Sequence, residues 1–239
     1  MKKTKKRQSS FPWKLVSIVI AIVVTLTVGT LIGSMNDDTT PPPTDDTAAS
    51  DAPNTLADLA RRDADDPLAM GEVDAPVVII EYADFTCKYC GVFAETTLPA
   101  LIEEYVEPGH VRIEWRDTPI LSEDSITTAI AGRAAAQQDL FWEFYEVMYA
   151  HTYSESGDYS RAALLSLAER IDGLDIETFT ADLDDPTLST AVHTEGSESR
   201  SLGVSSTPTF VVGDRVLQGA QPIEVFRDTI ESQLDTAAP

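Results

Sequence analysis

The chain has 239 residues, with 17 basic and 40 acidic side chains, a formal net charge of -23 at pH 7 and only two cysteines. Six of the basic residues fall in the first 14 positions, so the rest of the chain carries a net charge of about -29. Such a charge opposes binding to nucleic acid or anionic lipid, and we expect no nucleic-acid partner. We interpret the acidity as a solvated surface rather than as a site for a cationic ligand.

The N-terminal residues have the pattern of a membrane anchor. Residues 1–14 form a basic head, and residues 15–35 are uncharged and long enough, as a helix, to span the roughly 30 Å hydrocarbon core. Because positive flanks stay in the cytoplasm, the following residues are expected on the outer face of the cell membrane. A cleaved secretory signal is the alternative, although its apolar part is normally shorter, about 7 to 15 residues. We expect a retained single transmembrane helix, and both interpretations export the domain.

Residues 36–58 are predicted to form a disordered acidic and proline-rich tether. They are dominated by Asp, Thr, Ala and Pro, with three consecutive prolines at 41–43 and few apolar side chains to bury. The part of the chain beyond them is long enough for one domain with a substantial core.

The first half of that domain is expected at residues 70–122. An uninterrupted apolar run at 76–82 predicts a central strand buried on both faces, in which Glu81 is out of place. Apolar residues between 91 and 105 share one helix face, and Pro99 within them predicts a kink. Residues 111–115 alternate apolar and polar side chains after a Pro-Gly turn, which predicts a second strand.

Helical patterns then fill residues 123–203, and strands return at 204–236. We expect helices at 125–138, 139–150, 160–171, 176–183 and 186–202. Residues 209–212 and 215–218 flank the pair Gly213-Asp214 and predict a hairpin, followed by a last helix from about Pro222. The order predicts an α/β fold whose small sheet is split by an inserted helical subdomain.

Both cysteines lie in one Cys-x-x-Cys motif where the central strand passes to a helix. The free amide groups and the positive end of a helix dipole stabilise a thiolate at Cys87, and Lys88 adds a positive charge. Cys90, one turn further, is expected to be buried and to attack mixed disulfides formed at Cys87. Glu81 is a candidate acceptor for the Cys90 proton, unless its carboxylate curls to the sheet edge.

Other uses of the two thiols fit the sequence less well. A zinc site needs about four ligands, but a second cysteine pair is lacking and His110, His151 and His193 show no metal-ligand spacing. A structural disulfide across two residues would close a very small loop and constrain little of the unfolded chain. The spacing therefore favours redox chemistry.

Together with Glu81 and the Cys-x-x-Cys motif, the segment Ser206-Thr207-Pro208-Thr209-Phe210 resembles the DsbA-like branch of the thioredoxin superfamily. The resemblance covers about residues 74–234 and implies a thioredoxin fold interrupted by helices. It implies that Cys87 is an exposed nucleophile facing a substrate-binding loop formed by Thr207 and a cis Pro208. It implies no cofactor beyond the Cys87–Cys90 disulfide, and recycling by a quinone-linked membrane oxidase.

The motif departs from many oxidising members of that family, which carry Pro-His between the cysteines where this chain has Lys88 and Tyr89. We include Lys88 and Tyr89 among the site residues, although an exposed lysine is often only solvated. The hypothesis is a membrane-anchored oxidase that gives its disulfide to reduced exported proteins. A disulfide isomerase or reductase using the same site is an alternative, as is a non-catalytic, peptide-holding chaperone module.

Overall fold

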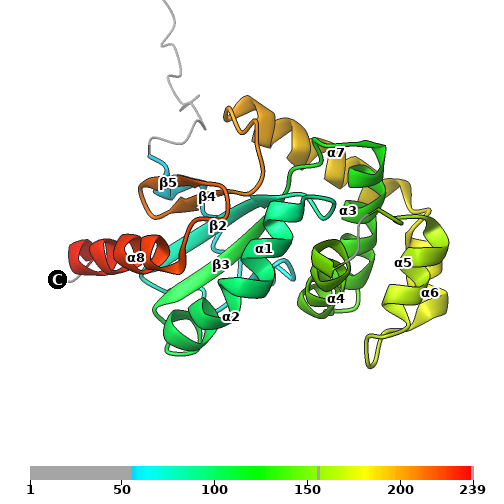
Figure 1. Cartoon of the computed structure of the whole chain (residues 1–239), viewed down its shortest axis with the longest axis horizontal. Coiled ribbons are helices and arrows are strands. Elements are labelled where there is room, and N and C mark those ends of the chain that lie inside the picture. The colour runs from blue at the N-terminus through cyan, green and yellow to red at the C-terminus, as the bar shows by residue number, and fades with distance from the viewer. Residues whose placement is uncertain (1–54, 155–156, 238–239) are drawn as a thin grey trace, which may run out of the picture. The chain divides into compact units, whose positions relative to one another are not determined.

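Five strands form a single sheet in the described part of the chain, residues 55–154 and 157–237 of a computed structural model (Figure 1). The strands are β1 (Ala69–Met70), β2 (Val77–Ala83), β3 (Val111–Asp117), β4 (Thr209–Val212) and β5 (Arg215–Gln218). The helices are α1 (Lys88–Thr96), α2 (Leu98–Leu101), α3 (Glu123–Ala136), α4 (Phe141–Ser154), α5 (Arg161–Ala168), α6 (Ile176–Asp182), α7 (Pro186–Ser201) and α8 (Ile223–Ala237). The sheet order is β1-β3-β2-β4-β5, in which β2 and β3 are parallel and the other pairs are antiparallel.

The helices α3 to α7 all lie between β3 and β4 in the sequence. Figure 1 shows α3, α4, α5 and α6 gathered beside the sheet, while α1 packs between them and the strands. The thioredoxin-type α/β fold with a helical insertion, predicted from the sequence, is confirmed, and so is the hairpin of β4 and β5.

The two faces of β2 meet different partners because side chains alternate along a strand. Val77, Ile79 and Ala83 belong to the main core, which also contains Phe93 of α1 and Phe226 of α8. The other face carries a smaller cluster of Val78, Ile80, Tyr82 and Val211, against which Leu56, Leu59, Ala60 and Val204 pack. The prediction of a disordered tether up to residue 58 is therefore wrong at its end, because Ala57–Leu59 form a 3-10 turn beside this cluster.

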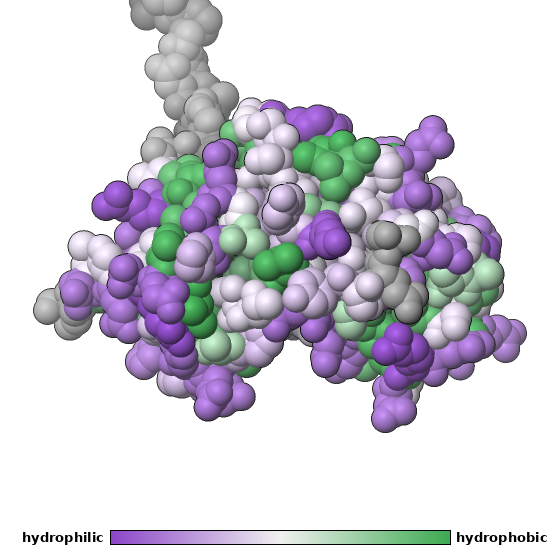
Figure 2. Space-filling model, viewed as in Figure 1, coloured by the Kyte–Doolittle hydropathy of each residue, from purple (hydrophilic) through white to green (hydrophobic). Residues whose placement is uncertain are grey.

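The predicted basic head, transmembrane helix and remaining tether lie outside the described residues. Within residues 55–154 and 157–237, no helix has the length and apolar character needed to cross a membrane. Figure 2 shows hydrophilic side chains over much of the visible face, with apolar patches between them.

Pro99 does more than kink a helix. The chain leaves helical geometry at Thr97, where φ is -120°, and Pro99 sits in the first turn of the separate helix α2. Proline is tolerated there because the first amide groups of a helix have no intrahelical partner. The chain then passes into a π-helical turn at Ile102–Val106.

Strand β3 is buried along its whole length, which its alternating sequence does not suggest. The polar side chains of β3 are satisfied by hydrogen bonds centred on Glu114. Its carboxylate accepts hydrogen bonds from Arg112 Nε at 3.1 Å and Arg116 Nη2 at 2.7 Å, and from the backbone N–H groups of Arg61 and Arg62 at 2.9 Å each. The segment before β1 thus covers a charged strand face that would otherwise meet water.

Candidate active site

Cys87 occupies the position immediately before α1. Its backbone is extended, with φ -80° and ψ 114°, and its carbonyl oxygen accepts the N–H of Gly91 at 3.1 Å. The backbone N–H groups of Tyr89 and Cys90, in the first helical turn, donate hydrogen bonds to the Cys87 sulfur. These amides lack intrahelical partners and are free to stabilise an anion.

The pKa of the Cys87 thiol is lowered from its ordinary value of 9.0 to about 6. The largest cause is a hydrogen bond from the Cys90 thiol; burial acts in the opposite direction. The Thr207 side chain and the backbone amides of Cys90 and Tyr89 lower the pKa further. The helix N-terminus predicted from the sequence therefore contributes, but the neighbouring thiol contributes more.

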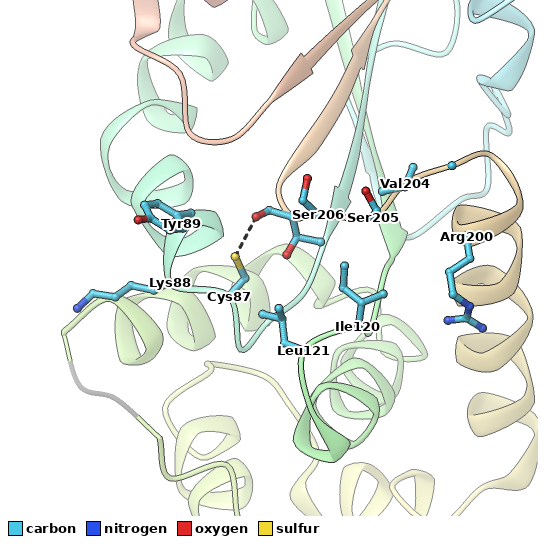
Figure 3. A pocket seen from close by; sticks show the side chains of 11 residues that line it. Cys87, Lys88, Tyr89, Ile120, Leu121, Arg200, Val204, Ser205 and Ser206 are labelled. Atoms are coloured by element: carbon cyan, nitrogen blue, oxygen red, sulfur yellow. Dashed lines mark hydrogen bonds between the residues drawn. The ribbon is translucent and has the colours of Figure 1, made fainter. Parts of the chain in front are cut away.

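The Cys87 side chain lies in a pocket of about 680 Å³ (Figure 3). The pocket is lined by Cys87, Lys88, Tyr89, Ile120, Leu121, Arg200, Gly203, Val204, Ser205, Ser206 and Thr207. Only 4% of Cys87 is exposed, whereas Tyr89 is 68% exposed and Leu121 54%. The implication of an exposed Cys87 is wrong in this respect, because the surrounding loops cover it and the sulfur is reached through the pocket.

The loop before β4 supplies the wall opposite Cys87. The Thr207–Pro208 peptide bond is cis, as the resemblance implies. The Cys87 thiol donates to the Thr207 carbonyl oxygen at 3.3 Å, the contact drawn in Figure 3. The buried Thr207 hydroxyl makes no hydrogen bond among the described residues while Cys87 is protonated, so the Thr207 side chain lowers the Cys87 pKa by donating to the thiolate. Thr209 pairs with Tyr82 of β2 and fixes the loop to the sheet.

Cys90 differs sharply from Cys87, although both thiols are free in this structure. Cys90 is fully buried, and its pKa is raised well above 9.0. Burial is the largest cause, followed by the hydrogen bond to Cys87 and the negative charges at Cys87 and Glu81. One thiol of the pair is therefore readily ionised, and the other holds its proton.

Glu81 does not curl to the sheet edge. It is 0% exposed and lies in the middle of the sheet, in register with Trp115 of β3 and Phe210 of β4. Burial raises the pKa of the carboxyl to about 8, while the Tyr145 hydroxyl acts in the opposite direction. That hydroxyl donates to both carboxylate oxygens, at 3.3 and 3.2 Å.

Sequence reasoning missed Tyr145 and Asp84. Tyr145 is 64 residues from Glu81, and its place in an aromatic helix gives no local signal. Asp84 accepts the Thr86 N–H at 2.9 Å and the backbone N–H groups of Ile120 and Leu121, at 3.1 and 3.3 Å. An aspartate at the end of a buried strand, two residues before a threonine, is a signal that could have found this anchor of the Cys87 loop.

Among the residues that the structure describes, no group of three or more His, Cys, Asp or Glu side chains is arranged to hold a metal ion. Lys88 is exposed and lines the pocket beside Cys87. The structure thus brings Cys87, Cys90, Glu81 and Thr207 together, and places Lys88 and Tyr89 at the pocket.

Comparisons with known proteins agree with this geometry. The family model described as "Thioredoxin" matches residues 63–232. The chain is 28% identical over 199 residues to the "Probable disulfide bond formation protein D" of Bacillus anthracis, covering 82% of this chain and 85% of that protein. It is 34% identical over 177 residues to the "Na(+)/H(+) antiporter NhaA 3" of Salinispora tropica, a match to 73% of this chain but 26% of that longer protein.

Solved structures share the fold. Oxidised BdbD from Bacillus subtilis superimposes with a TM-score of 0.65 at 24% identity, over 70% of this chain and 92% of that one. The residues matched by the family model, 63–232, include both halves of the sheet and the helices between them. The chain belongs to the thioredoxin family, in its DsbA-like branch, and is a protein-disulfide oxidoreductase.

Proposed function

We propose that the protein is a membrane-anchored, extracytoplasmic dithiol oxidase that transfers a Cys87–Cys90 disulfide to reduced exported proteins. The observation that favours oxidation of client proteins over their reduction is the pKa of about 6 at Cys87. A stabilised thiolate favours the reduced form of the enzyme over its disulfide, which makes the disulfide a stronger oxidant. The Bacillus anthracis relative is named a probable disulfide bond formation protein, which supports the same direction.

The transfer begins when a client thiolate attacks the Cys87 sulfur. The Cys87–Cys90 bond breaks, a mixed disulfide forms, and Cys90 leaves with the electron pair. Because the pKa of Cys90 lies well above 9.0, its thiolate takes up a proton, and Glu81, with a pKa of about 8, would supply it. Glu81 accepts that proton again when Cys90 attacks in the reverse direction.

A second client thiolate completes the exchange. It attacks the client sulfur of the mixed disulfide, so the client gains a disulfide and Cys87 leaves as a thiolate. A thiol of low pKa is a good leaving group, and the low pKa of Cys87 suits this step. Thr207 and Pro208 would bind the extended client beside the sulfur, and Lys88 and Tyr89 would contact it at the pocket.

The cellular setting is proposed from the sequence. Residues 15–35 would anchor the chain with residues 1–14 in the cytoplasm, and residues 36–54 would hold the domain at the outer face of the cell membrane. The domain would consist of residues 70–122 and 204–236, with 123–203 inserted between them. A quinone-linked membrane oxidase would restore the disulfide after each cycle.

The equilibrium of the Cys87–Cys90 pair with glutathione tests the direction. We expect a reduction potential closer to about -120 mV, typical of strong oxidants, than to about -270 mV, typical of thioredoxin. Cys87→Ala should abolish oxidation of a reduced model protein while leaving the fold intact by circular dichroism. A potential at the thioredoxin end would favour a reductase, and persistent client protection by Cys87→Ala without oxidation would favour a holding role.

A further inference from the structure

The buried carboxyl of Glu81 has a neighbour in the helical insertion that the thioredoxin-fold halves do not supply. Tyr145 of α4 is 2% exposed, and its hydroxyl lies 3.2 and 3.3 Å from the two Glu81 oxygens. Among the described residues, no other side chain donates a hydrogen bond to Glu81. In a low-dielectric site such a hydrogen bond is stronger than in water, and a buried polar group without a partner is costly.

We propose that Tyr145 is a positioning residue that holds the Glu81 carboxyl beside Cys90 and sets the pH at which the two exchange a proton. The inference rests on the proposed function, because it assigns a task within the same thiol exchange. It makes α4, part of the insertion, a working component of the redox site.

The packing of α4 against α1 places Tyr145 where this task requires it. Gly91 follows Cys90 in α1, and a Cβ added there would lie 3.4 Å from Tyr153 Cβ of α4. This distance is ordinary van der Waals contact, so α1 and α4 lie against each other directly beside Cys90. The Tyr145 and Tyr149 rings, 4.6 Å apart at their centroids, belong to the same core cluster as both cysteines.

The groups that face Glu81 come from two helices. Cys90 lies on α1 and Cys87 immediately before it, Tyr145 and Tyr149 lie on α4, and the strand neighbours in register are not titratable. The pKa of Tyr145 is raised well above 10.0, by burial first and then by Glu81 and Cys90. Its hydroxyl therefore stays protonated and remains a donor to the carboxylate throughout the working pH range.

Removing the Tyr145 hydroxyl should favour the neutral form of Glu81. A hydrogen bond to a charged group contributes about 1.5 kcal/mol or more, which corresponds to about one pKa unit. In Tyr145→Phe, the carboxyl should lose its proton about one pH unit higher than in the unaltered protein. The step that needs ionised Glu81, attack of Cys90 on a mixed disulfide at Cys87, should shift by the same amount.

Tyr149 provides a matched control. It lies one turn further along α4, is 0% exposed, and its hydroxyl donates to the Asp84 backbone carbonyl at 3.2 Å rather than to Glu81. Tyr149→Phe therefore removes an equally buried hydroxyl from the same helix. The measurement is the rate at which a Cys87–glutathione mixed disulfide closes to the Cys87–Cys90 disulfide, followed against pH.

We expect the midpoint of this profile to rise by about one pH unit in Tyr145→Phe and to stay in place in Tyr149→Phe. In a Glu81→Gln background the Tyr145 change should have no further effect on the profile. Equal shifts in both tyrosine variants, or a shift that persists without Glu81, would show that packing is responsible and overturn the proposal. Oxidation of dithiothreitol by the unaltered protein reports the proposed function separately.

A measurement on the unaltered protein covers the case in which Tyr145→Phe does not fold. With 13C-labelled Glu and Tyr, the Tyr145 ring-carbon signal next to the hydroxyl should follow the Glu81 carboxyl titration with the same midpoint. A Tyr145 signal that is insensitive to the ionisation of Glu81 would contradict the proposal.

Discussion

The two cysteines divide the chemistry because their sulfurs meet different surroundings. Cys87 receives hydrogen bonds from the Cys90 thiol and from backbone amides, whereas Cys90 is enclosed by apolar groups and near negative charges. The pKa of Cys87 thus depends on the neighbouring thiol more than on the helix N-terminus. The thiolate can thus be stabilised without the histidine of the Pro-His pair, in whose place this chain has Lys88 and Tyr89.

Cys90→Ala should therefore raise the pKa of Cys87. The variant loses the largest cause of the lowered value and keeps the amides, so the midpoint should move from about 6 part of the way towards 9.0. The rate of Cys87 alkylation by iodoacetamide against pH measures this midpoint. Lys88→Gln serves as a control with a smaller expected shift, because its exposed charge is screened by solvent and salt. An unchanged midpoint in Cys90→Ala would contradict the attribution.

Glu81 should make the domain less stable as the pH rises. Its folded pKa of about 8 lies above the ordinary 4.5, so its stabilising contribution is complete below pH 4.5 and is lost as the pH rises through about 8. Within that window each pH unit weakens folding by about 1.4 kcal/mol. Urea unfolding of the oxidised protein at pH 5 and pH 8 measures the change. Glu81→Gln should remove this part of the pH dependence, and an identical dependence in the variant would exclude the cause.

The sequence predicted the residues that share a local motif and missed those that meet through folding. Cys87 and Cys90 are three positions apart, and Thr207 and Pro208 are adjacent, so pattern and resemblance find them. The hydroxyl that contacts Glu81 comes from 64 residues away. Burial of Cys87 likewise depends on a loop that is distant in the chain.

At the scale of elements, β3 shows why alternation alone was insufficient. Its alternating polar residues are typical of a strand with one face in water, but the segment before β1 covers that face. A charged residue buried beside oppositely charged partners produces the same sequence pattern as an exposed one. Pro99 is a similar case, because a proline that starts a second helix after a break gives the same sequence pattern as a proline that kinks one continuous helix.

Loss of the Glu114 charge should destabilise the domain strongly. In Glu114→Gln the guanidinium groups of Arg112 and Arg116 stay buried without their carboxylate. Removing one partner of a buried ion pair typically costs about 3–5 kcal/mol. Chemical unfolding in urea gives the difference. Glu104→Gln, which breaks the exposed pair with Arg227, is the matched control and should change little; equal effects would show that burial does not matter.

At the scale of the whole molecule, the excess of acidic residues creates a negative electrostatic potential that is the sum of many charges rather than the result of one contact. After residue 14 the chain has 11 basic and 40 acidic side chains. Two of the basic ones, Arg112 and Arg116, are buried against Glu114, where they neutralise internal charge and leave the surface more negative. Like charges on the surface repel one another and weaken the compact state.

Added salt should therefore stabilise this domain over the range in which it screens charge. The Debye length falls from about 30 Å at 0.01 M to about 8 Å at 0.15 M, which removes most repulsion between distant carboxylates. The thermal midpoint of the purified protein should rise over that range, and most of the rise should precede 0.3 M. Sucrose at matched osmolality separates screening from a general co-solvent effect, because it leaves charges unscreened. If sucrose and sodium chloride raised the thermal midpoint equally, repulsion between the negative charges would contribute little to destabilising the folded state.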